Sequence, residues 1–155
     1  VGKSMKKMYG ALAGYLGLAV AAALAAVFFS GQPGTQSQGL SHGIVAWLFG
    51  LFGQEPTPEV MGTVNYFLRR GAHLFLYFCM GLGLCGAFQW QRKVPAWLPA
   101  MALGVAFAAT DEYHQLFSGG RTGKPTDVLL DACGLALGCG ASYLLGRLWR
   151  KRHLP

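Results

Sequence analysis

The first side chains that could do chemistry together lie in RRGAHLFLY, residues 69–77. On a helix, Arg69, His73 and Tyr77 are each four residues apart and form one row. Arg70 joins this row three residues before His73, so it offers cations, an imidazole and a phenol. Arginines can also snorkel at a membrane interface, and a tyrosine can belong to an aromatic belt. His73 lies a turn deeper in an apolar run, where polar side chains face a partner or a cavity, so we expect it to be functional.

A second polar cluster is TDEYHQ, residues 110–115. On a helix, Asp111 shares a face with His114 and Gln115, whereas Glu112 projects roughly 100° away. Neighbouring carboxylates repel in a low-dielectric setting, and the dipole at a helix C-terminus disfavours them further. The alternative is a helix end with solvated charges. We expect a nearby cation to neutralise the acids, and the candidates are Arg69, Arg70 and Arg121.

The third cluster begins with the glycine-rich turn SGGRTGKPTD, residues 118–127. Thr126 or Asp127 is expected to cap the helix that follows. Asp127 and Asp131 are four residues apart and share a face of this helix. Asp127 could be only a cap, but Asp131 lies a full turn inside an apolar span and needs a partner.

Long apolar stretches must position these three clusters. Of the 155 residues, 53% are hydrophobic and 12% are charged, about half the charge of an average soluble domain. Residues 8–30, 71–89 and 126–148 are each long enough to cross a bilayer as a helix of roughly 20 residues. Residues 94–110 are only just long enough, and the span reaches a comfortable length, residues 94–115, if the helix includes the second polar cluster. The sequence therefore predicts an all-α membrane protein with four transmembrane helices in a single domain, residues 5–155.

The segment of about forty residues between the first two spans is neither polar enough for a free loop nor apolar enough to cross a membrane. Residues 31–39 are rich in turn formers and predict a connector. Residues 40–53 are apolar and aromatic but too short to cross, which predicts an interfacial or re-entrant helix. Thr57 is expected to cap the next helix, with Pro58 in its first position, and this helix is expected to run unbroken into the second span.

Small residues within the spans predict close helix packing. Gly10, Gly14 and Gly17, followed by many alanines, form such a face on the first helix, and Gly134 and Gly138 form one on the last. The cysteines lie inside predicted spans without a Cys-x-x-Cys spacing, so we expect them to be packing residues. These cysteines are Cys79, Cys85, Cys133 and Cys139.

Basic residues flanking the spans predict the orientation. One side has nine of them, Lys3, Lys6, Lys7, Arg92, Lys93, Arg147, Arg150, Lys151 and Arg152. The other side has four, Arg69, Arg70, Arg121 and Lys124, together with all six acids. The positive-inside rule then predicts a multi-pass protein of the bacterial cytoplasmic membrane, with both termini cytoplasmic. Basic anchors that attract anionic lipid account for the net charge of +7, so no nucleic-acid partner is expected. Residues 1–4 are expected to be a cloning remnant ahead of an initiator at Met5 or Met8.

The ordered motifs resemble those of the VanZ-like family of small bacterial membrane proteins. They are Arg70-x-x-His73-x-x-x-Tyr77, Asp111-Glu112-x-x-Gln115-x-Phe117, Arg121, and Asp127-x-x-x-Asp131-x-x-Gly134-x-x-x-Gly138. The match covers about residues 69–138. The resemblance implies an association with resistance to glycopeptide antibiotics of the teicoplanin type, without a defined reaction. At the position of Asp131 it also implies Asn in many members, so an ionised carboxylate there is not required.

Three functions remain open. In the first, an outward-facing site binds an envelope lipid, a lipid-linked cell-wall precursor or the glycopeptide itself. In the second, an intramembrane enzyme acts on such a lipid, with His73 as general acid or base, Asp111 or Glu112 as its partner and Arg121 stabilising negative charge. In the third, the polar set only joins the helices. The expected binding residues are Arg69, Arg70, Tyr77, His114, Gln115, Arg121, Asp127 and Asp131.

No cofactor is predicted. A divalent metal held by His73, His114 and the carboxylates is a variant of the enzyme hypothesis, and no short-range ligand motif supports it. The sequence does not predict the oligomeric state.

Overall fold

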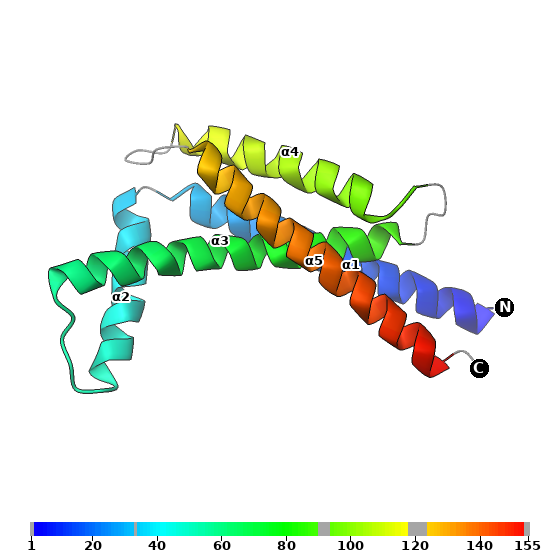
Figure 1. The fold of residues 1–155 in the computed structure, drawn as a ribbon, viewed down its shortest axis with the longest axis horizontal. Coiled ribbons are helices and arrows are strands. Elements are labelled where there is room, and N and C mark those ends of the chain that lie inside the picture. Colours follow the sequence, from blue (N-terminus) through cyan, green and yellow to red (C-terminus); the bar gives the residue numbers. More distant parts are fainter. Residues whose placement is uncertain (1, 33, 90–93, 118–123, 154–155) are drawn as a thin grey trace.

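The structure is a computed structural model that describes residues 2–32, 34–89, 94–117 and 124–153. These residues form helices and no strands, which confirms the predicted all-helical fold. The helices are α1 (Gly2–Ser30), α2 (Gly34–Gly50), α3 (Pro58–Phe88), α4 (Trp97–Gln115) and α5 (Pro125–His153). Four of them run along the long axis of the molecule, and α2 crosses one end (Figure 1).

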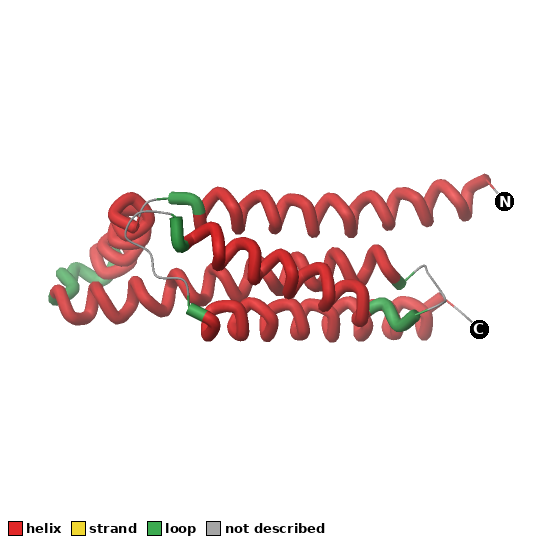
Figure 2. Tube along the Cα trace, turned by 90° about the horizontal axis from the view of Figure 1, so that it is seen from above, coloured by secondary structure: helices red, strands yellow, loops and turns green. Residues whose placement is uncertain are grey.

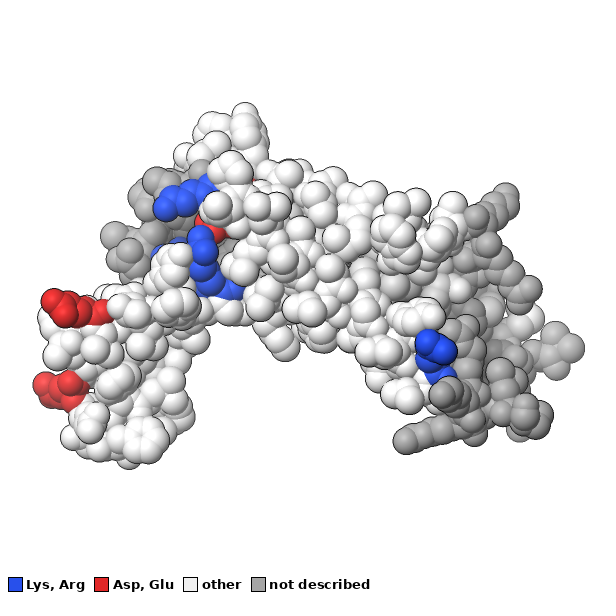
Figure 3. All heavy atoms as spheres, in the orientation of Figure 1, with Lys and Arg blue, Asp and Glu red and all other residues white. Residues whose placement is uncertain are grey.

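Three helices are long and apolar enough to cross a membrane: Met8–Ser30, Pro58–Phe88 and Pro125–Leu148. By the same measure α4 is not one of them, because the polar residues at its C-terminal end, from Thr110 to Gln115, lower its mean hydropathy. In Figure 3 the described charges gather toward the two ends and leave the middle of this face uncharged. Large apolar side chains are exposed along the helices, as lipid contact requires. Examples are Leu24, Phe75 and Leu137.

Helix α3 is at the centre of the bundle and packs against every other helix. Its contacts with α5 advance in step along both chains, from Arg70 with Asp127 to Phe78 with Gly138, so the two helices run parallel. A Cβ atom added at Gly134 would lie 2.6 Å from the carbonyl oxygen of Leu74, and one at Gly138 would meet the carbonyl of Phe78. The predicted close-packing face of the last helix is confirmed.

The face of small residues predicted on the first helix is wrong for its glycines, although Ala22 and Ala26, two of the alanines that follow them, are buried in the core. A Cβ added at Gly10, Gly14 or Gly17 would meet nothing within 4 Å. Close approach between α1 and α3 comes instead from Gly83, where a Cβ would lie 2.6 Å from the carbonyl oxygen of Tyr15. The ring of Tyr15 lies against Gly86 of α3, where a Cβ would meet the ring carbons. Small residues permit a close contact, but they do not select the neighbour.

Helix α2 begins at Gly34, so the predicted connector over residues 31–39 is wrong from that position onward. Helical hydrogen bonds satisfy the backbone near a membrane, where water is scarce, and this favours extending the helix. Its apolar part, Gly39–Gly50, is too short to span, as predicted. In Figure 2 this helix is seen nearly end-on while the other four extend lengthwise, so it crosses the bundle steeply.

Helix α3 begins as predicted. The Thr57 side chain accepts a hydrogen bond from the Val60 N–H at 3.4 Å, Pro58 follows, and the helix continues unbroken to Phe88. The predicted capping of α5 by Thr126 or Asp127 is wrong, because α5 already begins at Pro125. Proline is favoured in the first helical position, where its missing N–H costs nothing.

The start of α1 and the end of α5 lie at the same end of the bundle (Figure 1). Most side chains used to predict the orientation lie outside those the structure describes. They are Lys3, Lys7, Arg92, Lys93, Arg121, Arg150, Lys151 and Arg152. The side of the membrane on which each end lies therefore stays a prediction.

Candidate functional site

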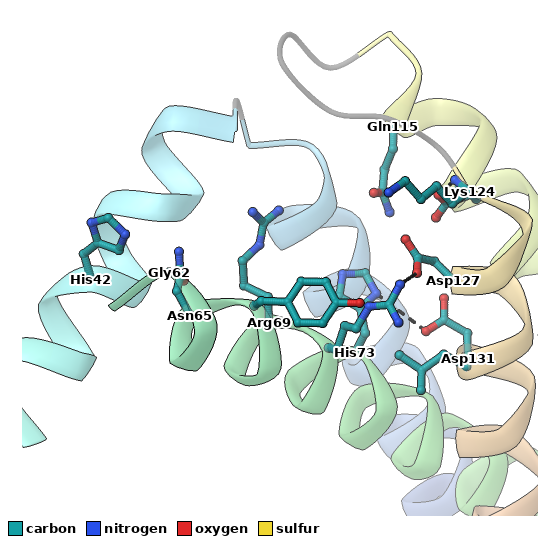
Figure 4. A pocket seen from close by; sticks show the side chains of 13 residues that line it. His42, Gly62, Asn65, Arg69, His73, Gln115, Lys124, Asp127 and Asp131 are labelled. Carbon is teal, nitrogen blue, oxygen red and sulfur yellow. Dashed lines mark hydrogen bonds and ion pairs between the residues drawn. The ribbon is translucent and has the colours of Figure 1, made fainter. Parts of the chain in front are cut away.

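A half-open pocket of about 490 Å³ lies at the end of the bundle opposite the termini, between α2 and α3 on one side and α4 and α5 on the other (Figures 1 and 4). Seven predicted site residues from α3, α4 and α5 meet there with His42 of α2 and with Lys124, which precedes α5. Its lining consists of His42, Gly62, Asn65, Tyr66, Arg69, Arg70, His73, Glu112, Gln115, Lys124, Asp127, Leu130 and Asp131.

Two pairs join α3 to α5 within this pocket. Arg70 forms an ion pair with Asp127, and its guanidinium also lies 4.8 Å from the centre of the Tyr66 ring. One turn deeper, His73 Nδ1 lies 3.7 Å from Asp131 Oδ1. The Asp131 side chain is only 3% exposed, so the partner that its burial demands is an imidazole.

Tyr77 lies beneath the pocket rather than in its wall. It is fully buried, and its ring stacks near that of His73 with 6.4 Å between ring centres and 16° between planes. Its hydroxyl oxygen and Asp131 Oδ1 are both buried without a hydrogen-bond partner among the described residues. A buried polar atom without a partner costs stability, so the floor of this pocket can accept further polar contacts.

The acids of α4 are held by neutral donors. Asp111 accepts hydrogen bonds from the Ser30 hydroxyl at 2.5 Å and the Gln115 amide at 3.4 Å. Glu112 accepts one from the backbone N–H of Lys124 at 2.5 Å. The prediction that Arg70 neutralises these acids is wrong, because this guanidinium pairs with Asp127. The end of α1 and the residue before α5 approach α4 at this level, and among the described residues they supply the hydroxyl of Ser30 and the N–H of Lys124 to these acids.

The pocket separates the predicted site residues into groups. Arg69, Arg70, His73, Glu112, Gln115, Asp127 and Asp131 line it. Asp111 lies behind the wall, and His114 is exposed beside Gly31 at the end of α1. The carboxylate paired with His73 is Asp131, where the sequence predicted Asp111 or Glu112. Arg121 lies outside the described residues.

Within the described chain, no group of three or more His, Cys, Asp or Glu side chains is placed to hold a metal ion. His73 lines the pocket and His114 does not. The two histidines of the metal hypothesis therefore do not meet in this pocket.

Several pocket residues were not predicted. Asn65 extends the row of Arg69 and His73 toward the helix start by one turn, so helical spacing could have found it. His42, which lines the pocket, and Ser30, which bonds to Asp111 behind its wall, had no such signal. Their neighbours in space are far away along the chain. Lys124 belonged to the predicted basic turn, but nothing in the sequence indicated that it faces α4.

A second cavity, of about 760 Å³, lies nearer the termini between α3, α4 and α5. Its lining is mostly apolar and includes Met101, Trp97 and Tyr143. None of the predicted site residues lines it. The chemistry indicated by the sequence therefore belongs to the first pocket.

Comparison with families of known proteins matches residues 10–146 to the family described as VanZ/LLP1. The matched residues include all of α2, α3 and α4 and most of α1 and α5. No curated protein and no solved structure matches the chain.

Proposed function

This chain belongs to the VanZ/LLP1 family, as its motifs indicated, and we propose that it binds an envelope ligand in an outward-facing pocket and so contributes to teicoplanin-type glycopeptide resistance. The candidate ligands are an envelope lipid, a lipid-linked cell-wall precursor and the glycopeptide itself. Membership of the family links the chain to glycopeptide resistance and to the membrane.

We place the protein in the bacterial inner membrane with four spans and cytoplasmic termini. Helix α4 is the fourth span, because its apolar residues lie beside three helices that are themselves long enough to cross. Its polar end then reaches the outer boundary together with the pocket. The excess of basic residues on the side of the termini supports this orientation.

The observation that carries the binding proposal is the convergence of ionisable side chains on a half-open cavity. Ionisable groups within membrane helices are costly and mark functional sites by default. Pairs that served only to join helices could pack without a cavity. This one has a volume within the range of roughly 300–1,000 Å³ that is typical of ligand pockets.

Thermal unfolding of purified protein in neutral detergent tests the proposal. Phosphatidylglycerol, a polyprenyl phosphate and teicoplanin are added separately, and we expect at least one to raise the melting temperature. Gly62→Trp should abolish this response, because Gly62 lines the pocket and a Cβ there meets nothing within 4 Å. Gly10→Trp is the matched control at an equally open site on α1. If no ligand acts, or if Gly62→Trp responds like the wild type, the proposal is wrong.

A second candidate function is an intramembrane acid–base enzyme, favoured by the His73–Asp131 pair at the pocket floor. A carboxylate beside an imidazole orients the ring and stabilises its protonated form, as in general acid–base catalysis. The test is turnover of a lipid phosphate or a lipid-linked sugar. His73→Ala should abolish turnover in protein that still folds, although it also lowers the melting temperature by leaving buried Asp131 without its partner. Absence of turnover across a broad lipid panel would leave binding as the function.

A further inference from the structure

Most charged groups in the pocket already have partners. Asp127 pairs with Arg70, Asp131 with His73, and Glu112 accepts from the Lys124 N–H. Arg69 lies one residue from Arg70 on α3 and is half-buried, but its guanidinium makes no ion pair or hydrogen bond with any described residue. The same holds for the side-chain ammonium of Lys124. Among the described residues, Arg69 and Lys124 are therefore the pocket cations without a partner, and Glu112 is bonded only to a neutral donor.

These two cations come from different walls. Arg69 rises from α3, and Lys124 extends from the start of α5 toward Gln115 (Figure 4). A group that contacts both must present anionic oxygens in more than one direction. Phosphate does so, and guanidinium and ammonium are its usual partners in proteins, the first as a planar fork and the second as a point charge.

Asn65 adds an independent indication of a ligand. Its side chain lines the pocket one turn before Arg69, is only 7% exposed, and leaves Oδ1 buried without a partner among the described residues. Buried acceptors in native proteins are nearly always satisfied. A hydroxyl group on a ligand in the pocket is a donor of the kind that this oxygen lacks.

We propose that the pocket binds a phosphate ester that carries a free hydroxyl group, with the phosphate between Arg69 and Lys124 and the hydroxyl donating to Asn65. This rests on the proposed function, because it specifies the ligand of the same pocket. The phosphate belongs either to a lipid headgroup or to a soluble ester. The acids hold Arg70, His73 and the start of α5 in place and do not contact the anion.

Binding of three lipids to purified protein in neutral detergent tests the chemistry. Phosphatidylglycerol has a phosphate with hydroxyls, phosphatidylmethanol has the phosphate without them, and phosphatidylcholine neutralises the phosphate with its own cation. We expect affinity to fall in that order. Asn65→Leu should remove the difference between the first two lipids. Glycerol 3-phosphate distinguishes the sources, because equal affinity for this soluble ester would identify it as the ligand in place of the lipid.

Charge-removing variants test the placement. Arg69→Gln or Lys124→Gln should each lower the affinity for phosphatidylglycerol by about 10- to 100-fold, the usual effect of losing one charge-assisted contact. Arg147→Gln is the matched control, because it removes an exposed cation distant from this pocket. Melting without lipid verifies that each variant folds.

The outcomes separate this inference from the proposed function. If both pocket variants bind phosphatidylglycerol like the wild type, or if phosphatidylcholine binds equally well, the phosphate inference is wrong. If teicoplanin or a zwitterionic lipid still stabilises the wild type but not Gly62→Trp, the proposed binding function stands and only the phosphate inference is lost. Failure of every ligand to bind the wild type refutes both.

Discussion

Replacing Gly138 with alanine should weaken the contact between α3 and α5 that supports the pocket. The added Cβ would meet the Phe78 carbonyl oxygen and would lie 2.6 Å from the Leu82 backbone nitrogen. Both are backbone atoms, so a side-chain rotation cannot relieve the clash and the helices must separate. Overpacking of this kind costs about 1–3 kcal/mol, whereas alanine gains about 1 kcal/mol over glycine in helix propensity.

Gly140 supplies a matched control on the same helix. It is exposed, and a Cβ there meets nothing within 4 Å, so Gly140→Ala gains the propensity term without the clash. The free energies of unfolding should therefore differ by about 1–3 kcal/mol between the two variants, with Gly138→Ala the less stable.

Thermal unfolding in neutral detergent measures this difference. For a chain of this size it corresponds to melting temperatures roughly 2–12 °C apart. Equal shifts in the two variants would show that α3 and α5 are not in backbone contact at Gly138.

Three further predictions concern the polar residues and the orientation. Asp131→Asn should cost less than about 1 kcal/mol of stability because the amide remains a partner for the imidazole, whereas Asp131→Leu should cost about 3–5 kcal/mol in thermal unfolding; a leucine variant as stable as the wild type would exclude a structural role for this pair. Ser30→Ala should cost about 1–3 kcal/mol, because buried Asp111 keeps only one of its two side-chain donors. The measurement is again the melting temperature, and an unchanged value would mean that water replaces the hydroxyl. A cysteine placed at Gly119 should react with a membrane-impermeant maleimide in intact cells but not with one confined to the cytoplasm; the opposite pattern would reverse the orientation.

Elements whose signals are local were predictable. The apolar stretches gave the three longest helices, and Thr57 with Pro58 gave the start of α3. Row spacing on a single helix placed Arg69 and His73 on one pocket wall. Each inference uses residues within a few turns of one another, where helix geometry alone determines which side chains meet.

Contacts between distant segments were not predictable in the same way. The bond from Ser30 to Asp111 joins residues 81 positions apart, and nothing in either segment identifies the other. The glycines of α1 were predicted to pack because small residues allow close contact. In the structure the close contact on α1 is at Tyr15, which faces Gly83 and Gly86 of α3. Partner choice depends on the shapes of two surfaces, and a pattern along one helix describes only one of them.

A signal for the central place of α3 was nevertheless present in its own glycines. Gly81 and Gly83 are two positions apart, which is roughly 200° around a helix, so they face opposite directions. Gly81 contacts α5 at Leu135, and Gly83 contacts α1 at Tyr15. Glycines on opposite faces predict a helix packed between two others.

The crossing of α3 and α5 also explains where the polar pocket and the apolar cavity lie. The helices are closest where Gly134 and Gly138 meet residues 74–82 of α3. Parallel helices that cross at one level diverge above and below it, and Figure 1 shows this divergence. The polar pocket opens on one side of the crossing and the apolar cavity on the other. Acids and arginines line only the polar pocket. The crossing therefore makes room for both cavities, but the residues that line each cavity determine whether it can bind a charged ligand.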